Sequence, residues 1–351
     1  MEGDKTAVAA DAGVQRKGKD PRKHHYVPVF YQRNFANEAG LLWVYDRRRG
    51  TFKELHPSVI CFEKDLYALK PENKPRDMQV ESKVLWMIDT LGARGIRDFQ
   101  LGKANSEAEK EIALFMAFQY GRVPTISRDV RATYAKAIEE LSRVTFANVD
   151  RAKAVMEKYA RETGEPMTVT PESMVEAVQG KHLKITATEV TFLTNMMEQA
   201  TNLSKLLTRL GWEVLTASEE TGFIICDCPV VVVPPKGSKE VGFLVPGSAK
   251  YMPISRHLCL RLGEPGSFRR HRKIDKDAVR IVNFNIAANS ERFIMGPSRA
   301  QLENIVARSG SNQMESTPRF ILETVGSDDD GALQRLSTQP RRYFYPKNGD
   351  Q

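Results

Sequence analysis

Cysteine is scarce in this sequence. The chain of 351 residues has only four cysteines, and a chain of this length can bury a core without disulfides or structural metals. Cys226 and Cys228 are two residues apart, while Cys61 and Cys259 are isolated. Zinc sites instead use C-x-x-C pairs or a histidine at short spacing. We therefore expect four reduced thiols and no structural zinc.

Long apolar runs are also missing. No run approaches the roughly 20 residues that a membrane-spanning helix requires, so the sequence excludes a transmembrane protein and predicts no membrane partner. Near the start, the small residues Ala7–Ala10 are followed at once by Asp11. This stretch lacks the apolar core of a secretion signal. We expect a cytoplasmic protein.

The familiar cofactor and hydrolase motifs are absent as well. The sequence contains no G-x-G-x-x-G, no Walker A motif, no H-E-x-x-H and no G-x-S-x-G. It therefore assigns no cofactor, and a divalent metal held by scattered ligands is left open.

Positive charge is in excess, with 52 Lys and Arg against 44 Asp and Glu. Part of this excess lies in residues 1–25 and 334–351, so the remainder is nearly balanced. Two basic clusters remain, Arg47–Arg49 and Arg269–Lys273. Neither alternates with aromatic residues, which favours exposed loop tips over a nucleic-acid surface. Nucleic acid stays open as a partner.

The pattern of polar, apolar and turn residues predicts one α+β domain. We expect a disordered basic arm over 1–23, a single domain over 24–326 and a C-terminal tail over 327–351. Within the domain, 24–70 should form an N-terminal hairpin region, with strands at 41–45 and 51–55 and a further short strand at 65–69. A helical block should span 76–210, and a mostly antiparallel sheet with late helices should span 211–326.

Within the helical block, specific signals mark the helix ends. The apolar stripe from Val80 should stop at Gly92, and Ser106-Glu-Ala-Glu109 is typical of a capping box. The next pattern runs from Pro124 to about Ala160 as one helix or two. Thr170-Pro171 predicts the start of another helix.

The segment His24-His-Tyr-Val-Pro-Val-Phe-Tyr-Gln-Arg33 resembles the opening of an uncharacterised, largely bacterial family of single-domain proteins. Further motifs extend the resemblance over roughly residues 24–300: Leu42–Asp46, Gln119 with Arg122 and Pro124, Phe223 and Ile224 with Asp227 and Pro229, and Asn283 with Asn285 and Arg292. Gln32 and Cys228 depart from the family pattern of Leu and Asn. The resemblance implies a single fold unit and candidate positions, but no reaction.

Six residues are candidates for a site. His25 titrates near neutral pH and could be an acid, a base or a metal ligand, with Asp227 and Glu81 as possible carboxylate partners. Arg33 and Arg122 could clamp a phosphate or carboxylate, and Asn285 could bind substrate. Four of them have a stated structural alternative: a hydrogen bond at a strand junction for His25, carbonyl capping or an ion pair for Arg122, a turn contact for Asp227, and a solvated helix face for Glu81.

Two functional hypotheses follow. The first is a hydrolase of a phosphate-containing substrate, possibly nucleic acid, with His25, Asp227 and Glu81 as catalytic groups. The second is a non-catalytic sensor or interaction module that recognises an anionic ligand or a partner protein with the same pocket. Both require His25, Arg122 and Asp227 to converge.

Overall fold

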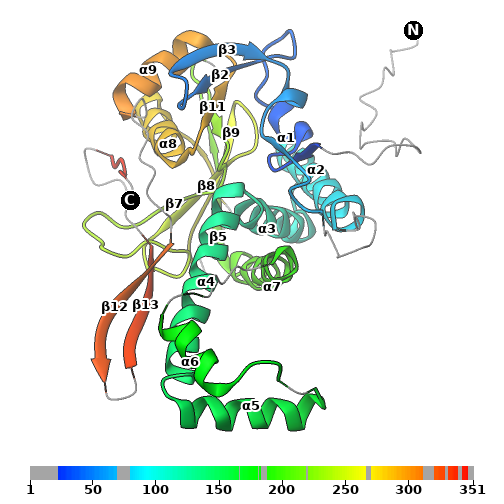
Figure 1. Ribbon diagram of the computed structural model, residues 1–351. Helices are drawn as coiled ribbons and strands as arrows, with labels where there is room; N and C mark the ends of the chain where they lie inside the picture. Colours follow the sequence, from blue (N-terminus) through cyan, green and yellow to red (C-terminus); the bar gives the residue numbers. More distant parts are fainter. Residues whose placement is uncertain are drawn as a thin grey trace. The chain divides into compact units, whose positions relative to one another are not determined.

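A computed structural model provides the structure of this protein and describes residues 23–68, 80–165, 167–180, 182, 188–218, 220–265, 270–310, 320–328, 331–338 and 342–346 (Figure 1). The chain forms two compact units. Unit 1 comprises residues 1–124, 195–315 and 341–351, and unit 2 comprises residues 125–194 and 316–340. The arm expected over 1–23 lies outside the described residues, apart from Lys23.

Unit 1 holds most of the sheet structure. Its five-stranded sheet has the order β10-β5-β9-β8-β7, and its four-stranded sheet has the order β3-β2-β11-β6. The strands are β2 (Leu42–Asp46), β3 (Thr51–Leu55), β5 (Leu210–Thr216), β6 (Ile225–Cys226), β7 (Val231–Val233), β8 (Ala249–Pro253), β9 (Leu258–Pro265), β10 (Arg270–Lys273) and β11 (Phe293–Gly296). All pairs are antiparallel except β10 with β5. A separate antiparallel pair joins β1 (Lys23–His25) and β4 (Phe62–Lys64).

The helices lie in both units. In unit 1 these are α1 (Val29–Arg33), the short η1 (Pro57–Val59), the π-helical turn η2 (Val80–Leu85), α2 (Trp86–Gln100), α3 (Ser106–Gly121), α8 (Lys276–Asn289) and α9 (Arg299–Ser309). Unit 2 contains α5 (Val149–Thr163), α6 (Pro171–Gln179) and the hairpin of β12 (Phe320–Asp328) and β13 (Gly331–Thr338). Two helices, α4 (Pro124–Thr145) and α7 (Glu189–Leu207), have residues in both units.

The α+β class predicted from the sequence is confirmed. The first hairpin forms as expected, with Asp46 opposite Thr51, and Gly50 adopts the positive φ of +62° that its tight connection requires. The helix predicted at Thr170-Pro171 is α6, and the side chain of Thr170 accepts the N–H of Ser173. Helix α3 is buried on nearly every side, as its run of apolar residues predicts.

The helix expected to stop at Gly92 continues to Gln100, so this prediction is wrong. Gly92 and Gly95 face α3, where a Cβ on Gly95 would lie 2.9 Å from Cγ1 of Ile112. Glycine inside a helix costs about 1 kcal/mol relative to alanine, but here it lets two helices approach closely. These glycines serve packing, and they do not end the helix.

Other local expectations need correction. The strand expected at 65–69 lies earlier, as β4, because Asp65 turns the chain with a φ of +56°. The N-cap of α3 is Asn105, whose Oδ1 accepts the N–H groups of Glu107 and Ala108. Arg270–Lys273 is strand β10 and not the expected loop tip. It pairs in parallel with β5, which lies far away in the sequence.

The segment 124–160 forms two helices, with a break before Asn148, whose side chain caps α5. Residues 342–346, inside the expected tail, belong to unit 1, and Phe344 contacts the side chain of Asn285. A single domain over 24–326 stays a prediction. Across the described residues, no helix combines the length and apolar character needed to cross a membrane.

Candidate functional site

His25 lies at the end of β1, opposite Phe62 of β4. Its ring is 5.6 Å from the ring of Phe62, and its Nε2 is 3.2 Å from the carbonyl oxygen of Ser58. Burial lowers the pKa of His25 below its ordinary 6.5, and the positive charges of Lys23 and Arg122 act in the same direction. At neutral pH the imidazole is therefore uncharged.

The preceding histidine, His24, was missed by the sequence reasoning and is buried completely. Its Nδ1 accepts the backbone N–H of Tyr67 at 3.0 Å, and the two rings stack with centroids 5.7 Å apart. Because neighbouring side chains of a β-strand point to opposite faces, His24 enters the core while His25 lies on the other, half-buried face. Only burial distinguishes the two, and two adjacent histidines in the sequence do not reveal it.

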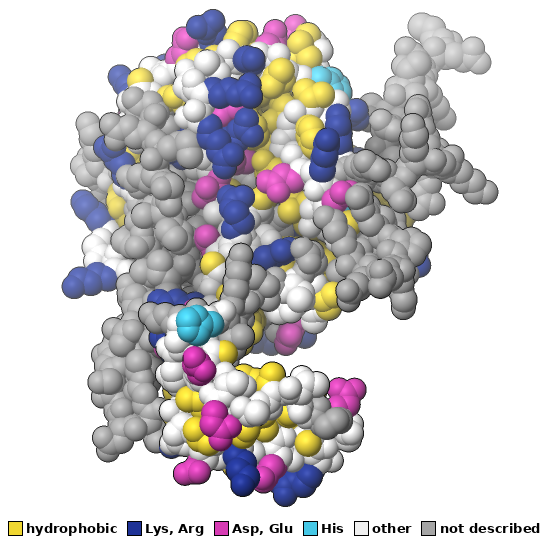
Figure 2. Space-filling model, in the orientation of Figure 1, with side chains coloured by type: hydrophobic (Ala, Val, Ile, Leu, Met, Phe, Trp, Pro, Cys, Tyr) yellow, Lys and Arg dark blue, Asp and Glu magenta, His cyan; other side chains and the backbone are white. Residues whose placement is uncertain are grey.

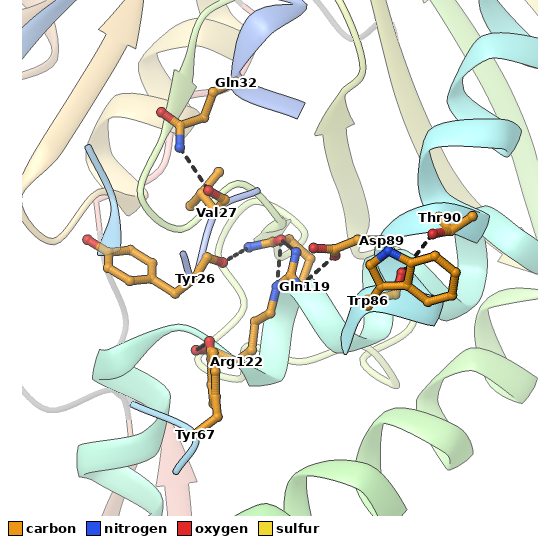
Figure 3. A network of polar contacts seen from close by, with 9 residues as sticks. All are labelled: Tyr26, Val27, Gln32, Tyr67, Trp86, Asp89, Thr90, Gln119 and Arg122. Carbon is orange, nitrogen blue, oxygen red and sulfur yellow. Dashed lines mark hydrogen bonds and ion pairs between the residues drawn. The ribbon is translucent and has the colours of Figure 1, made fainter. Parts of the chain in front are cut away.

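Arg122 is at the centre of a buried polar network at the end of α3 (Figure 3). Its Nε and Nη2 donate to Oε1 of Gln119 at 2.9 and 2.5 Å, and its Nη1 donates to Oδ1 of Asp89 at 2.7 Å. Its carbonyl oxygen accepts the hydroxyl of Tyr67 at 2.8 Å. The Arg122 side chain has no exposed surface, so an external anion has no access to it in this structure.

The network ties the N-terminal motif to the helices. Nε2 of Gln119 donates to the carbonyl oxygen of Tyr26 at 2.7 Å, and Nε2 of Gln32 donates to that of Val27 at 2.8 Å (Figure 3). Burial raises the pKa of Asp89, although the charge and hydrogen bond of Arg122 act against this rise. The two family-like motifs, one at residues 25–28 and one at 119–124, are thus joined directly by the hydrogen bond from Gln119 to Tyr26.

Asp227 follows β6 and is buried. Its Oδ1 accepts the N–H of Glu291 at 2.9 Å, and its Oδ2 accepts those of Arg292 and Phe293 at 2.7 and 3.1 Å. Burial raises the pKa of this carboxyl, while the three N–H groups act against the rise. Asp227 therefore anchors the segment that leads from α8 into β11, a role different from the local turn contact considered above.

Asn285, Arg33 and Glu81 are the remaining candidates. The side chain of Asn285 donates to the carbonyl of Phe344 at 2.9 Å and accepts its N–H at 3.0 Å, so it pairs with the backbone of the C-terminal segment. Arg33 is exposed at the end of α1. The side chain of Glu81 lies outside the described residues.

The contacts bring Arg122 and the His25 motif together, and they give Asp227 and Asn285 other partners. The Arg122 charge acts on the pKa of His25, and the Asp227 charge raises the pKa of Tyr26 after the larger effect of burial. No group of three or more His, Cys, Asp or Glu side chains in the described part of the chain could hold a metal ion. Catalytic roles for these residues stay predictions.

A cleft of about 430 Å³ lies elsewhere in unit 1, between α8, α9 and two loops. Its lining includes the basic residues Arg256, His257, Lys276 and Arg280, and one acidic residue, Glu220. Arg280 also pairs with the exposed carboxylate of Asp277 at 2.6 Å. The cleft is therefore mainly basic, with part of that charge already balanced.

The N-terminus of α9 contributes to the same cleft through Pro297, Ser298 and Gln301. Ser298 is the N-cap residue, but its side chain makes no capping hydrogen bond. The first N–H groups of a helix lack partners within the helix and carry partial positive charge. Helix α9 thus adds to the positive potential that Arg256, Lys276 and Arg280 create.

Two side chains hold the floor of the cleft in place. Asn283 accepts the N–H of Ile224 at 3.1 Å and donates to the carbonyl of Gly222 at 2.9 Å, and Gln301 donates to that same carbonyl at 2.7 Å. A Cβ on Gly222 would lie 3.1 Å from the carbonyl oxygen of Arg256. In the sequence, only the family-like Asn283 pointed to this cleft. The basic residues come from separate segments with no common spacing, so the sequence gives no sign that they line one site.

The fold and its contacts define an α+β protein with a buried polar network and a separate basic cleft. The chain belongs to the family described as "Protein of unknown function (DUF4238)", whose family model matches residues 23–300. This confirms the resemblance to an uncharacterised family. No curated protein and no solved structure matches the chain.

Proposed function

We propose that this protein recognises a small phosphate-bearing anion in the cleft between α8 and α9. The observation that carries the proposal is the convergence of Arg256, Lys276 and Arg280 with the N-terminus of α9 around one cleft. Helix N-termini and arginine forks are the groups that proteins commonly use to bind phosphate. Recognition of an anionic ligand was already one hypothesis from the sequence, with Arg122 as one of its binding residues. Because Arg122 is buried, the proposed binding site is now the cleft between α8 and α9.

The dimensions and the unused hydrogen-bonding groups support such a ligand. A volume of about 430 Å³ falls in the range of small-molecule sites, roughly 300–1,000 Å³, and exceeds what a single phosphate fills. The Nε of Arg256 is buried and has no hydrogen-bond partner among the described residues. A phosphate oxygen would supply the acceptor that this N–H lacks.

The test is calorimetric titration of the full chain at low salt with inorganic phosphate and with ribose 5-phosphate. Replacing one charged hydrogen bond, as in Arg256→Gln or Lys276→Gln, should weaken binding about 10-fold or more, because such bonds contribute about 1.5–3 kcal/mol. Arg308→Gln is the matched control: it removes one charge from the opposite end of α9 and should leave the affinity unchanged. If Arg308→Gln weakened phosphate binding as much as the cleft variants did, binding would depend only on the overall positive charge, and the cleft would not be the site.

The hydrolase hypothesis stays a second candidate. Its support is a neutral, half-buried His25 within electrostatic reach of Arg122. It requires Asp227 to exchange its three backbone N–H partners for a metal or substrate, which the hydrogen bonds to residues 291–293 make costly. Divalent-metal binding that is lost in both His25→Gln and Asp227→Asn, with the fold intact, would favour it over the cleft.

Nucleic acid as a partner and a cytoplasmic location are further predictions. Arg47 donates to Oγ of Ser290 at 3.2 Å, and Arg272 pairs with Glu213 at 2.8 Å. These contacts occupy part of each basic cluster, so nucleic-acid affinity should be weak and should fall steeply as salt rises from about 50 to 200 mM.

A further inference from the structure

The cleft between α8 and α9 has a set of uncharged side chains besides its basic ones. Gln301 and Asn304 of α9 are polar, and Val279 of α8 and Ile305 of α9 add apolar surface. The volume of about 430 Å³ leaves room for more than a single phosphate. The uncharged side chains therefore face the part of a ligand that lies beyond its phosphate.

The amides of Gln301 and Asn304 have hydrogen-bonding atoms to spare. Nε2 of Gln301 donates to the carbonyl of Gly222 at 2.7 Å, but its Oε1 accepts no hydrogen bond from the described residues. Asn304 is exposed, and its side chain makes no hydrogen bond within the described part of the chain. A carboxamide offers an acceptor oxygen and an NH₂ donor, and a hydroxyl can both donate and accept. These two amides are therefore suited to bind hydroxyl groups.

The cleft lacks a surface on which a nucleobase could stack. Among the described residues that line it there is no Phe, Tyr or Trp, and the one ring, the imidazole of His257, is exposed. Proteins that hold nucleobases commonly stack them on aromatic side chains. The lining therefore favours a ligand rich in hydroxyls over a nucleotide.

Glu220 limits the negative charge that the cleft accepts. Its carboxylate is exposed at the lining and has no ion-pair partner among the described residues. A ligand with a chain of phosphates would bring further negative charge toward this carboxylate, and like charges repel. One phosphate group therefore suits the charges of the cleft better than two or three.

We propose that the ligand of this cleft is a phosphorylated sugar or polyol with a single phosphate. This inference rests on the anion recognition proposed above and identifies the remainder of the ligand. The phosphate lies against the basic side chains of the cleft, hydroxyl groups bond to Gln301 and Asn304, and C–H groups of the sugar pack on Val279 and Ile305.

Positive charge is not confined to the cleft. Figure 2 shows Lys and Arg side chains gathered on the visible face, in the part of unit 1 where β2, β3 and β11 lie in Figure 1. Such a surface attracts any small anion weakly, so the test must compare ligands of equal charge. Ribose 5-phosphate and AMP meet this condition, because each has one phosphate monoester and no other charge at pH 7.5.

Calorimetric titration of the full chain with inorganic phosphate, ribose 5-phosphate and AMP tests the inference. Ribose 5-phosphate should bind at least about 10-fold more tightly than inorganic phosphate, because its hydroxyls add hydrogen bonds. AMP should bind no more tightly than ribose 5-phosphate, since its base finds no stacking surface. Tighter binding of AMP would identify a nucleotide site and overturn the sugar assignment.

Asn304→Ala removes a hydroxyl-binding group and leaves the charges of the cleft unchanged. It should weaken the binding of ribose 5-phosphate about 3- to 10-fold and leave that of inorganic phosphate unchanged. Glu303→Gln is the matched control: this neighbouring side chain lies outside the lining and pairs with Arg299 at 2.8 Å, so the ratio of the two affinities should stay the same. Circular dichroism should show both variants folded, because both side chains are exposed.

The possible outcomes separate this inference from the proposed function. If neither inorganic phosphate nor ribose 5-phosphate binds, or if Arg256→Gln leaves both affinities unchanged, the anion site is wrong and the sugar assignment falls with it. If both ligands bind equally tightly and both depend on Arg256, the anion site stands and the sugar assignment is overturned. The same holds if Asn304→Ala leaves the ratio of the two affinities unchanged.

Discussion

Removing the carboxylate of Asp227 should destabilise the protein strongly. In Asp227→Ala the N–H groups of residues 291–293 lose their acceptors inside the protein. A hydrogen bond to a charged group contributes about 1.5–3 kcal/mol. With part of the loss recovered by water, the free energy of unfolding should fall by about 4 kcal/mol, and the melting temperature by about 8–16 °C.

Asp227→Asn should cost less, because the amide keeps one acceptor oxygen. That oxygen can still accept the two N–H groups of Arg292 and Phe293, but the NH₂ then faces the N–H of Glu291. We expect a loss of about 1–2 kcal/mol. The free energy of unfolding should therefore decrease from the wild type to Asp227→Asn and further to Asp227→Ala.

Urea denaturation followed by circular dichroism measures both losses. Asp277→Asn is the control, since this carboxylate is 80% exposed in its ion pair with Arg280 and should change stability by less than about 1 kcal/mol. An Asp227→Ala variant as stable as the wild type would refute the anchoring role. If that variant also lost metal binding, the hydrolase hypothesis would replace it.

Three further predictions follow from the structure. Burial lowers the pKa of His25 below 6.5, so the neutral side chain stabilises the fold above pH 6.5, and this contribution is lost as the pH falls through the lowered pKa. In urea denaturation at pH 7.5 and pH 5, the free energy of unfolding should therefore depend less on pH in His25→Gln than in the wild type. Gly95→Ala should lower the melting temperature, since its Cβ would lie 2.9 Å from Ile112, at a cost of about 1–3 kcal/mol; a gain in stability would contradict close helix packing. Asn285→Ala should speed hydrogen exchange at the amide of Phe344, which donates to the Asn285 side chain; unchanged exchange would show that the C-terminal segment is held by other contacts.

The fold class was accessible from the sequence because its signals are local. A Thr-Pro pair starts α6, an apolar run predicts the buried α3, and Gly50 ends the tip of the first hairpin. Each of these depends on residues within a few positions of one another. The same locality produced the errors at Gly92 and Arg270, where a distant helix or strand overrides the local preference.

The candidate residues were found by type and motif, but their partners were not. The sequence singled out Arg122 and Asp227 through the family-like motifs that contain them. It could not show that Arg122 is paired with Asp89 and Gln119, or that Asp227 accepts bonds from a segment 64 to 66 residues away. Charged side chains in a core need partners, and chain topology selects which ones.

The sequence by itself determined that a helical block is present, the first hairpin, the α+β class and the family-like motifs, because periodicity, capping and turn preference act over a few residues. Only the tertiary structure decided that Arg122 is inaccessible, that Asp227 anchors the approach to β11, and that basic residues from separate segments line one cleft. Burial, charge pairing and cavity shape arise from contacts between distant segments, and the order of residues along the chain does not specify them locally.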